Sequence, residues 1–208
     1  MAEKYKLTYF NAKGFAEPIR LIFANAGVQY EDNRIEREDW PTLKNTFPWG
    51  QLPVLQFGDK TLSQSNTICR FLGRKFNLTG SNDWEAARVD ELADALSDFR
   101  KEVEKIFGES AEKDEVKKAE LTANFLSNIS PLFFGNLESS IAKNGDSPYL
   151  VGKNLTWIDL QVAHSLDLFD TIMPNMVGAF PKLRKLKDTV YKIPQIAEWI
   201  EKRPKTNF

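Results

Sequence analysis

The sequence predicts an α/β domain followed by an all-α domain. Three observations support this prediction: strands and helices follow one another as βαβ and then ββα in the first 80 residues, the composition breaks at 80–83, and helical periodicity runs through the rest of the chain. We therefore expect two domains, at residues 1–80 and 81–208.

The first predicted unit is strand–helix–strand. Apolar and polar residues alternate over 4–10, which places Tyr9 on the inward face of a strand. A helix is expected over 16–26, with Pro18 in its first turn. Residues 28–35 have the polar pattern of an edge strand. Because a helix connects the two strands, they should be parallel.

The second predicted unit is a hairpin followed by a helix. Residues 52–57 and 61–63 form the strands, joined by the turn 58–60, and a helix is expected over 66–76. The complete order, βαβ and then ββα, is the thioredoxin-like arrangement. Redox members of that fold carry paired cysteines, but this chain has no CxxC motif.

After Gly80-Ser81-Asn82-Asp83, every periodic segment is helical. Pro131 is expected to kink the second helix. The expected helices cover 87–107, the region from the charged stretch 109–118 to residue 143, 156–173, 181–191 and 194–202. Thr156-Trp157-Ile158-Asp159 is a variant capping box that should begin a buried helix.

Composition restricts the function classes. The net charge of −1 provides no global field for nucleic acid or anionic membranes, so neither is expected as a partner. Cys69 is the single cysteine and His164 the single histidine, which excludes internal disulfides and argues against a metal centre. The start of the chain has no signal-peptide pattern, and no run is long enough to span a bilayer, so we expect a cytoplasmic protein.

Tyr9 is the candidate catalytic residue. It lies near the carboxyl end of a strand, where ligands of open α/β sheets collect. A phenol can stabilise a thiolate but cannot form a disulfide, which points to activation of a thiol cofactor. The alternative is a core tyrosine that packs beside Leu7.

Three further features are candidates for ligand binding. Pro53 within an apolar strand is explained either by a cis Leu52–Pro53 bond or by an edge strand. Gln64-Ser65-Asn66 precedes a helix, where the chain either binds an anion or supplies Ser65 or Asn66 as an N-cap. Trp40 and Lys44 share a face if they form a helical turn. Either the two side chains together hold a carboxylate, or Trp40 is a packing residue and Lys44 is a solvated lysine.

These residues together resemble the cytosolic glutathione transferases, above all the sigma class with its invertebrate members and the glutathione-dependent prostaglandin D synthases. The resemblance covers the full chain. The motifs that carry it are Tyr-Lys-Leu-Thr-Tyr-Phe at 5–10, Glu-Asp-Trp-Pro at 38–41, Pro-Trp-Gly-Gln-Leu-Pro-Val-Leu at 48–55, Gln-Ser at 64–65 and Leu-Thr-Trp-Ile-Asp at 155–159.

The resemblance implies a glutathione site in the first domain, with glutathione as co-substrate and no metal. Tyr9 would donate a hydrogen bond to the glutathione sulfur, and Asp98 of a partner subunit would reach the γ-glutamyl amine, so a homodimer is implied. The implied glutathione-binding residues are Tyr9, Trp40, Lys44, Gly50, Gln51, Leu52, Pro53, Gln64, Ser65 and Asp98.

Two positions depart from the family pattern. Many sigma-class members have an arginine shortly after the catalytic tyrosine, where this chain has Phe15, with Lys13 two residues earlier. The prostaglandin isomerases carry a tryptophan in the helix corresponding to 84–107, where this chain has Lys105-Ile106-Phe107. The electrophile pocket, expected between the domains and lined by Phe10, Phe15 and that helix, should therefore differ from theirs.

The implied activity is conjugation of the glutathione thiolate to hydrophobic electrophiles in detoxification, with glutathione peroxidase activity as a further activity to test. Two alternatives stay open. One is a glutathione-dependent isomerase that converts prostaglandin H to prostaglandin D, and the other is a non-catalytic binding or structural protein on the same scaffold.

Overall fold

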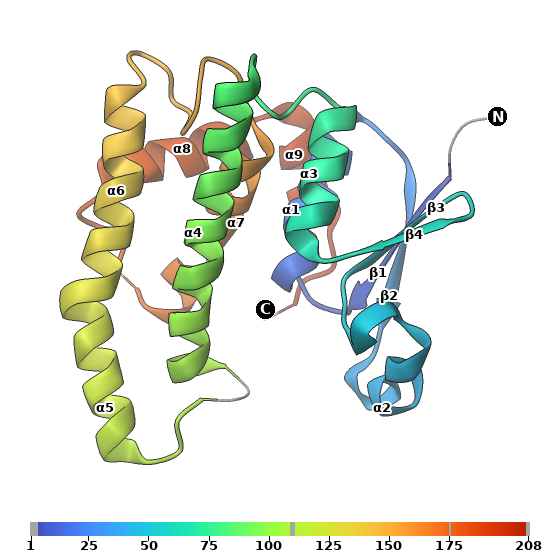
Figure 1. Cartoon of the computed structure of the whole chain (residues 1–208), viewed down its shortest axis with the longest axis horizontal. Helices are drawn as coiled ribbons and strands as arrows, with labels where there is room; N and C mark the ends of the chain where they lie inside the picture. The colour runs from blue at the N-terminus through green and yellow to red at the C-terminus, as the bar shows by residue number, and fades with distance from the viewer. Residues whose placement is uncertain (1–3, 109–110, 175, 207–208) are drawn as a thin grey trace. The chain divides into compact units, whose positions relative to one another are not determined.

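The computed structural model describes residues 4–108, 111–174 and 176–206 (Figure 1). These residues pack as two compact units, one formed by the chain up to Thr79 together with the chain from Thr189 onward, the other by Gly80–Asp188. The division of the sequence into domains 1–80 and 81–208 stays a prediction. In the packing, the segment from Thr189 onward joins the first unit. The expected features at residues 1–3 and at Glu109 lie outside the described residues.

A four-stranded sheet organises the first unit. Its strands are β1 (Tyr5–Phe10), β2 (Tyr30–Ile35), β3 (Val54–Phe57) and β4 (Lys60–Ser63), in the spatial order β2-β1-β3-β4. The β1–β2 pair is parallel, and the β1–β3 and β3–β4 pairs are antiparallel. The predicted parallel pairing of β1 with β2, the predicted β3–β4 hairpin and the edge position of β2 are confirmed.

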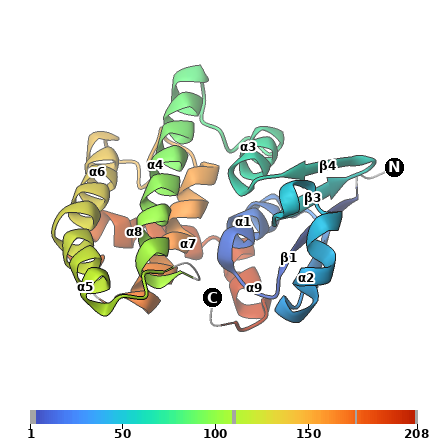
Figure 2. The ribbon, with the colours of Figure 1, turned by 60° about the horizontal axis from the view of Figure 1, so that its bottom comes forward.

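Besides the short helix α2 (Trp40–Leu43), described below, three helices of this unit lie near the sheet. They are α1 (Glu17–Ala26), α3 (Ser65–Lys75) and α9 (Pro194–Lys202), and α1 lies beside both of the others (Figure 2). Helix α1 ends at Gly27, whose φ of 63° is the left-handed conformation that suits a C-cap glycine. The fully buried side chains of this unit's core include Leu7, Ile19, Ile22, Phe23, Leu55, Ile68 and Leu72.

The connection from β2 to β3 is a series of short helical turns. Within it, α2 (Trp40–Leu43) has Pro41 in its first turn, and a 3₁₀ turn at Pro48–Gly50 begins at a proline. Proline suits the start of a helix because the missing N–H would have no partner there. This segment carries several of the predicted ligand-binding residues.

Helices make up the second unit. They are α4 (Asp83–Phe107), α5 (Glu115–Asn124), α6 (Ser130–Lys143), α7 (Trp157–Ile172) and α8 (Pro181–Tyr191), whose last residues extend into the first unit. A π-helical turn, Phe125–Ile129, joins α5 to α6 just before Pro131. A proline removes one helical N–H, and the wider π turn at the preceding residues is the form that the predicted irregularity takes.

The capping box at the start of α7 is confirmed. Buried Asp159 accepts hydrogen bonds from the Thr156 N–H and hydroxyl, and from the Leu150 N–H at 2.8 Å. Burial raises the pKa of Asp159 from its ordinary 3.8 to about 6, because these three bonds offset only part of the desolvation. His164, also on α7, is buried.

Candidate functional site

Tyr9 lies one residue before the end of β1, with its side chain buried. Its phenol oxygen accepts a hydrogen bond from the backbone N–H of Phe15, with 3.2 Å between the two atoms. A Cβ atom placed on Gly14 would lie only 2.6 Å from the same oxygen. The absence of a side chain at Gly14, whose φ is +39°, therefore allows the loop to close over the hydroxyl.

This arrangement favours negative charge beside the hydroxyl. A phenol that accepts one hydrogen bond still has its own hydrogen to donate. The 3₁₀ turn Gly14–Ala16 leads directly into α1, so the Phe15 N–H belongs to the amino-terminal end of a helix. The positive end of a helix dipole stabilises an anion. Gly14 was not identified from the sequence, although a glycine just before a helix start is a usable signal.

An aromatic chain connects Tyr9 to α2. The ring of Phe10 packs edge-on against Tyr9, with 5.4 Å between centroids, and against Trp40 at 5.3 Å. Phe47 also stacks on Trp40, with 6.0 Å between centroids. The structure thus brings Tyr9, Phe10 and Trp40 together, and adds Phe47, which the sequence analysis did not single out. Phe15 is about half exposed, with 47% of its surface accessible.

Trp40 and Lys44 form the helical turn that was expected. The Lys44 N–H donates to the Trp40 carbonyl oxygen, and Lys44 keeps helical backbone angles. A Cβ atom on Gly50 would lie 3.4 Å from Cγ and Cε of Lys44, so the lysine stem lies against Gly50. Lys44 as a residue is exposed. Carboxylate binding by this pair stays a prediction.

The Leu52–Pro53 peptide bond is cis, as one of the two hypotheses required. The alternative, a proline on an edge strand, is wrong, because β3 lies between β1 and β4 in the sheet. The ladder itself begins at Val54 rather than at Leu52, since proline has no N–H to donate to a neighbouring strand.

The side chains of Gln64 and Gln51 are in contact although the two residues are 13 positions apart in the sequence. The Gln64 side-chain Nε2 donates to the Gln51 Oε1 at 3.0 Å. Gln64 itself, and neither Ser65 nor Asn66, occupies the N-cap position of α3, with an unusual φ of 73° and no side-chain cap. The proposed N-cap role of Ser65 or Asn66 is therefore wrong. A non-glycine residue in this conformation is often held at a ligand site.

Asp98 is the predicted site residue that belongs to the second unit. It lies on α4 with 77% of its side chain exposed, and it accepts a hydrogen bond from Lys101 at 2.9 Å. That hydrogen bond raises the pKa of Lys101. The role of Asp98 toward a partner subunit stays a prediction.

Comparison with known proteins identifies the family. Residues 5–74 match the family described as "Glutathione S-transferase, N-terminal domain", and residues 97–203 match "Glutathione S-transferase, C-terminal domain". The chain belongs to the glutathione S-transferase family. It is 41% identical to "Glutathione S-transferase 1" of Ascaris suum over 210 residues, which cover 99% of both chains.

Solved structures of the glutathione S-transferase fold agree with this assignment. "Prostaglandin synthase D" of Nilaparvata lugens superposes with a TM-score of 0.90 at 41% identity, covering 98% of this chain and all of the other. A glutathione S-transferase of Necator americanus, described as monomeric, gives a TM-score of 0.89 at 38% identity, covering 99% of this chain and all of the other.

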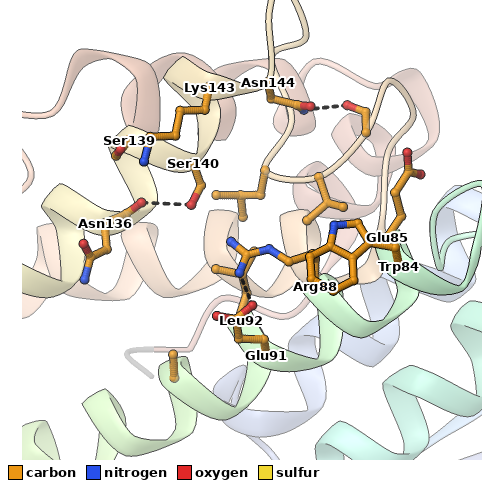
Figure 3. Close-up of a pocket in the computed structure, with 14 residues that line it drawn as sticks. Trp84, Glu85, Arg88, Glu91, Leu92, Asn136, Ser139, Ser140, Lys143 and Asn144 are labelled. Atoms are coloured by element: carbon orange, nitrogen blue, oxygen red, sulfur yellow. Dashed lines mark hydrogen bonds and ion pairs between the residues drawn. The ribbon is translucent and has the colours of Figure 1, made fainter.

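Each unit also contains a cavity. One, of about 660 Å³, lies in the second unit between α4 and α6, where Trp84 and Arg88 face Ser140 and Lys143 (Figure 3). The other, of about 410 Å³, lies in the first unit among α1, β2 and α9. The described lining of neither cavity includes a predicted glutathione-binding residue.

The described residues contain no cluster of three or more metal-ligating side chains. Within the same part of the chain, no helix combines the length and the apolar character that crossing a membrane requires. Cys69 is a buried thiol on α3.

Proposed function

We propose that this chain conjugates the thiolate of glutathione to hydrophobic electrophiles, with Tyr9 as the residue that stabilises the thiolate. The observation that carries the proposal is the Tyr9 hydroxyl, buried at the end of β1 with its oxygen already accepting the Phe15 N–H. The full-length similarity to glutathione S-transferase 1 of Ascaris suum supports the same reaction class.

The energetics are sufficient for this role. A thiol of cysteine type has a pKa of about 8.5, so only a few per cent is ionised at neutral pH. A hydrogen bond to a charged group contributes roughly 1.5–3 kcal/mol, which lowers the thiol pKa by about one to two units. Bound glutathione would then be about one quarter to three quarters ionised near pH 7. Positioning of the electrophile beside the sulfur must supply much of the remaining acceleration.

The remaining first-unit residues would hold the peptide. Gln64 and Ser65, at the amino-terminal end of α3, suit the γ-glutamyl carboxylate. The indole of Trp40, the ammonium of Lys44 and the amide of Gln51 suit the glycine carboxylate. Leu52, before the cis Pro53, would offer its backbone to the cysteinyl part. Gly50 supports this set because the stem of Lys44 lies against it.

Four finer assignments belong to the proposal. We assign the chain to the sigma class, to detoxification in the cytoplasm, and to a homodimer in which Asp98 of one subunit reaches the γ-glutamyl amine held by the other. Phe10 and Phe15 would contact the electrophile. Because a relative from Necator americanus is described as monomeric, the dimer needs its own measurement, for example by light scattering.

A second candidate function is glutathione-dependent isomerisation of prostaglandin H to prostaglandin D. It is favoured by the 41% identity to a protein described as prostaglandin synthase D. Lys105-Ile106-Phe107 argues against it, since this region lacks the tryptophan that the resemblance leads one to expect.

A substrate panel with glutathione tests both candidates and the non-catalytic alternative. The panel contains 1-chloro-2,4-dinitrobenzene, an unsaturated aldehyde, cumene hydroperoxide and prostaglandin H. We expect conjugation of the first two compounds, with formation of a carbon–sulfur bond and, for the nitrobenzene, release of chloride. Turnover of prostaglandin H alone would favour the isomerase, and glutathione binding without turnover of any compound would favour a non-catalytic protein.

A further inference from the structure

A buried ion pair lies at the start of α1, outside the predicted glutathione-binding set. Glu17 and Arg20 each have fully buried side chains, and the Arg20 Nη1 lies 3.2 Å from the Glu17 Oε2. Arg20 also donates through Nε to the Asp32 Oδ1 of β2 at 3.0 Å. Charges buried to this extent need hydrogen-bond partners, and the removal of one member of such a pair is strongly destabilising.

On one side, the pair is anchored to the carboxyl-terminal part of the chain. The Glu17 Oε1 accepts a hydrogen bond from the indole Nε1 of Trp199 at 2.8 Å and another from the Arg203 Nη1 at 2.8 Å. Trp199 belongs to α9 and Arg203 follows directly after that helix. One carboxylate oxygen of Glu17 therefore receives two donors that lie more than 180 residues away in the sequence.

On the other side, the pair holds the loop that covers Tyr9. The Arg20 Nη1 donates to the backbone carbonyl oxygen of Ala12 at 2.7 Å and approaches that of Lys13 at 3.4 Å. Two residues further on, the Phe15 N–H donates to the Tyr9 phenol oxygen. A continuous path of hydrogen bonds thus connects the end of α9, through Glu17 and Arg20, with the loop that contacts the hydroxyl.

We propose that Glu17 and Arg20 are positioning residues for the glutathione reaction, and that Trp199 and Arg203 complete their function from the carboxyl-terminal segment. This inference rests on the proposed function. The path fixes the carbonyls at 12 and 13, and so keeps the Phe15 N–H on the Tyr9 oxygen. When the path is broken, the loop relaxes, the hydroxyl becomes a weaker donor and the bound thiolate is less stabilised.

Trp199→Phe combined with Arg203→Gln tests the inference, since it removes the two donors from the carboxyl-terminal segment to the Glu17 Oε1 while it keeps an aromatic ring on α9. Both altered side chains are only partly buried, so the fold should tolerate the change. We expect the pKa of bound glutathione, followed by thiolate absorbance in the full-length protein, to rise, with a roughly three- to tenfold fall in the thiolate fraction at pH 7. kcat should fall in proportion, whereas KM for glutathione should change by less than about twofold.

Lys202→Gln is the matched control. Lys202 is adjacent to Arg203 and pairs with exposed Glu198, so its loss removes a positive charge from the same segment without breaking the path. It should leave the thiolate titration and kcat unchanged. Arg203→Lys, which retains a cationic donor, should restore most of what Arg203→Gln loses.

A double-mutant cycle separates positioning from general destabilisation. In a Tyr9→Phe background, the Trp199→Phe and Arg203→Gln changes should cause no further loss of kcat, because the group through which they act is gone. The inference is overturned if the double variant lowers only the melting temperature and keeps the wild-type thiolate titration. It is also overturned if its effect on kcat is the same with and without the Tyr9 hydroxyl. Failure of the proposed function is distinct, since the wild-type protein would then conjugate no electrophile.

Discussion

The backbone N–H of Phe15 donates a hydrogen bond to the phenol oxygen of Tyr9. The residue just before Phe15 is Gly14, where the Cβ atom of any larger residue would lie too close to the same oxygen. The residue proposed to activate the thiol is therefore held by main-chain atoms of the next segment. Side-chain substitutions at Phe15 would leave this hydrogen bond in place, whereas changes in the course of the loop would remove it.

Removal of the Tyr9 hydroxyl should lower conjugation strongly. The Tyr9→Phe variant keeps the ring and loses a hydrogen bond to a charged sulfur, so kcat/KM should fall roughly 10- to 100-fold. Steady-state kinetics with glutathione and 1-chloro-2,4-dinitrobenzene measures the change. Equal activity of the variant and the wild-type protein would exclude tyrosine activation.

Unlike Tyr9→Phe, the Tyr30→Phe variant should change stability and leave conjugation unchanged. Among the described residues, the buried Tyr30 hydroxyl has no hydrogen-bond partner, and burial raises its pKa. Because the removal of an unsatisfied buried hydroxyl is favourable, the variant should be more stable by about 1 kcal/mol with unchanged conjugation. Urea denaturation measures the stability. A loss of stability would indicate that the hydroxyl binds a partner such as an ordered water.

Gly14→Ala should lower kcat, beyond the loss of stability that any residue with a side chain causes at a left-handed φ. Its methyl group would lie 2.6 Å from the Tyr9 oxygen, which must then move. Gly27→Ala is the control, because Gly27 also has a left-handed φ, of +63°, but has no atom within 4 Å of the added carbon. Both variants should lose about 1–2 kcal/mol of stability from backbone strain. Only Gly14→Ala should also lose kcat, and equal kinetics for the two variants would contradict the proposed close approach.

Lys44→Gln should weaken glutathione binding without slowing the chemical step. An exposed charge pair contributes at most about 1 kcal/mol, so KM for glutathione should rise by about two- to fivefold, with the difference reduced in high salt. Lys60→Gln, at an exposed lysine on β4, serves as the control and should leave KM unchanged. A larger effect on kcat than on KM would argue that Lys44 acts on the sulfur instead.

Asp159 should make the free energy of unfolding decrease as the pH rises. Its pKa is about 6 in the folded protein against 3.8 ordinarily, so between these values the folded state binds more protons than the unfolded state. Stability from this group is therefore fully present below pH 4 and falls as pH rises through 6, by about 3 kcal/mol in total. Asp159→Asn should be destabilised because its NH₂ group cannot accept from Thr156. The stability difference between wild type and variant, measured by denaturation at pH 4 to 7, should shrink as pH rises. A constant or growing difference would contradict the raised pKa.

Local sequence patterns predicted most elements of this fold. The alternation over 4–10, the proline and glycine at the two ends of α1, and the capping box of α7 each correspond to an observed element. The boundaries of the elements were predicted less accurately. Helix α4 begins at Asp83, whereas the sequence pattern placed its start at residue 87. The pattern missed the first turn because that turn carries the exposed Trp84 and has no apolar stripe. The Asn82 cap, which accepts from the Glu85 N–H, was the missed signal.

The sequence named the individual residues of the candidate site, but it did not predict the contacts among them. The Gln64–Gln51 hydrogen bond and the N-cap role of Gln64 depend on how β4 leads into α3, whereas residue preferences alone favour Ser65 or Asn66. The Glu17–Trp199 contact joins residues 182 positions apart, and no local pattern contains such a pairing. Contacts between residues so far apart in the sequence can be identified only from the folded structure.

The position of Arg203 has a practical consequence for work with this protein. A protease that cuts after Lys202 would release the guanidinium from Glu17 while the sheet and α1 stay intact. The cleaved protein would have nearly the mass and the circular dichroism spectrum of the intact protein, yet its kcat should be lower. Kinetic measurements should therefore be accompanied by mass spectrometry of the intact carboxyl-terminal peptide, and affinity tags are better attached at the opposite end.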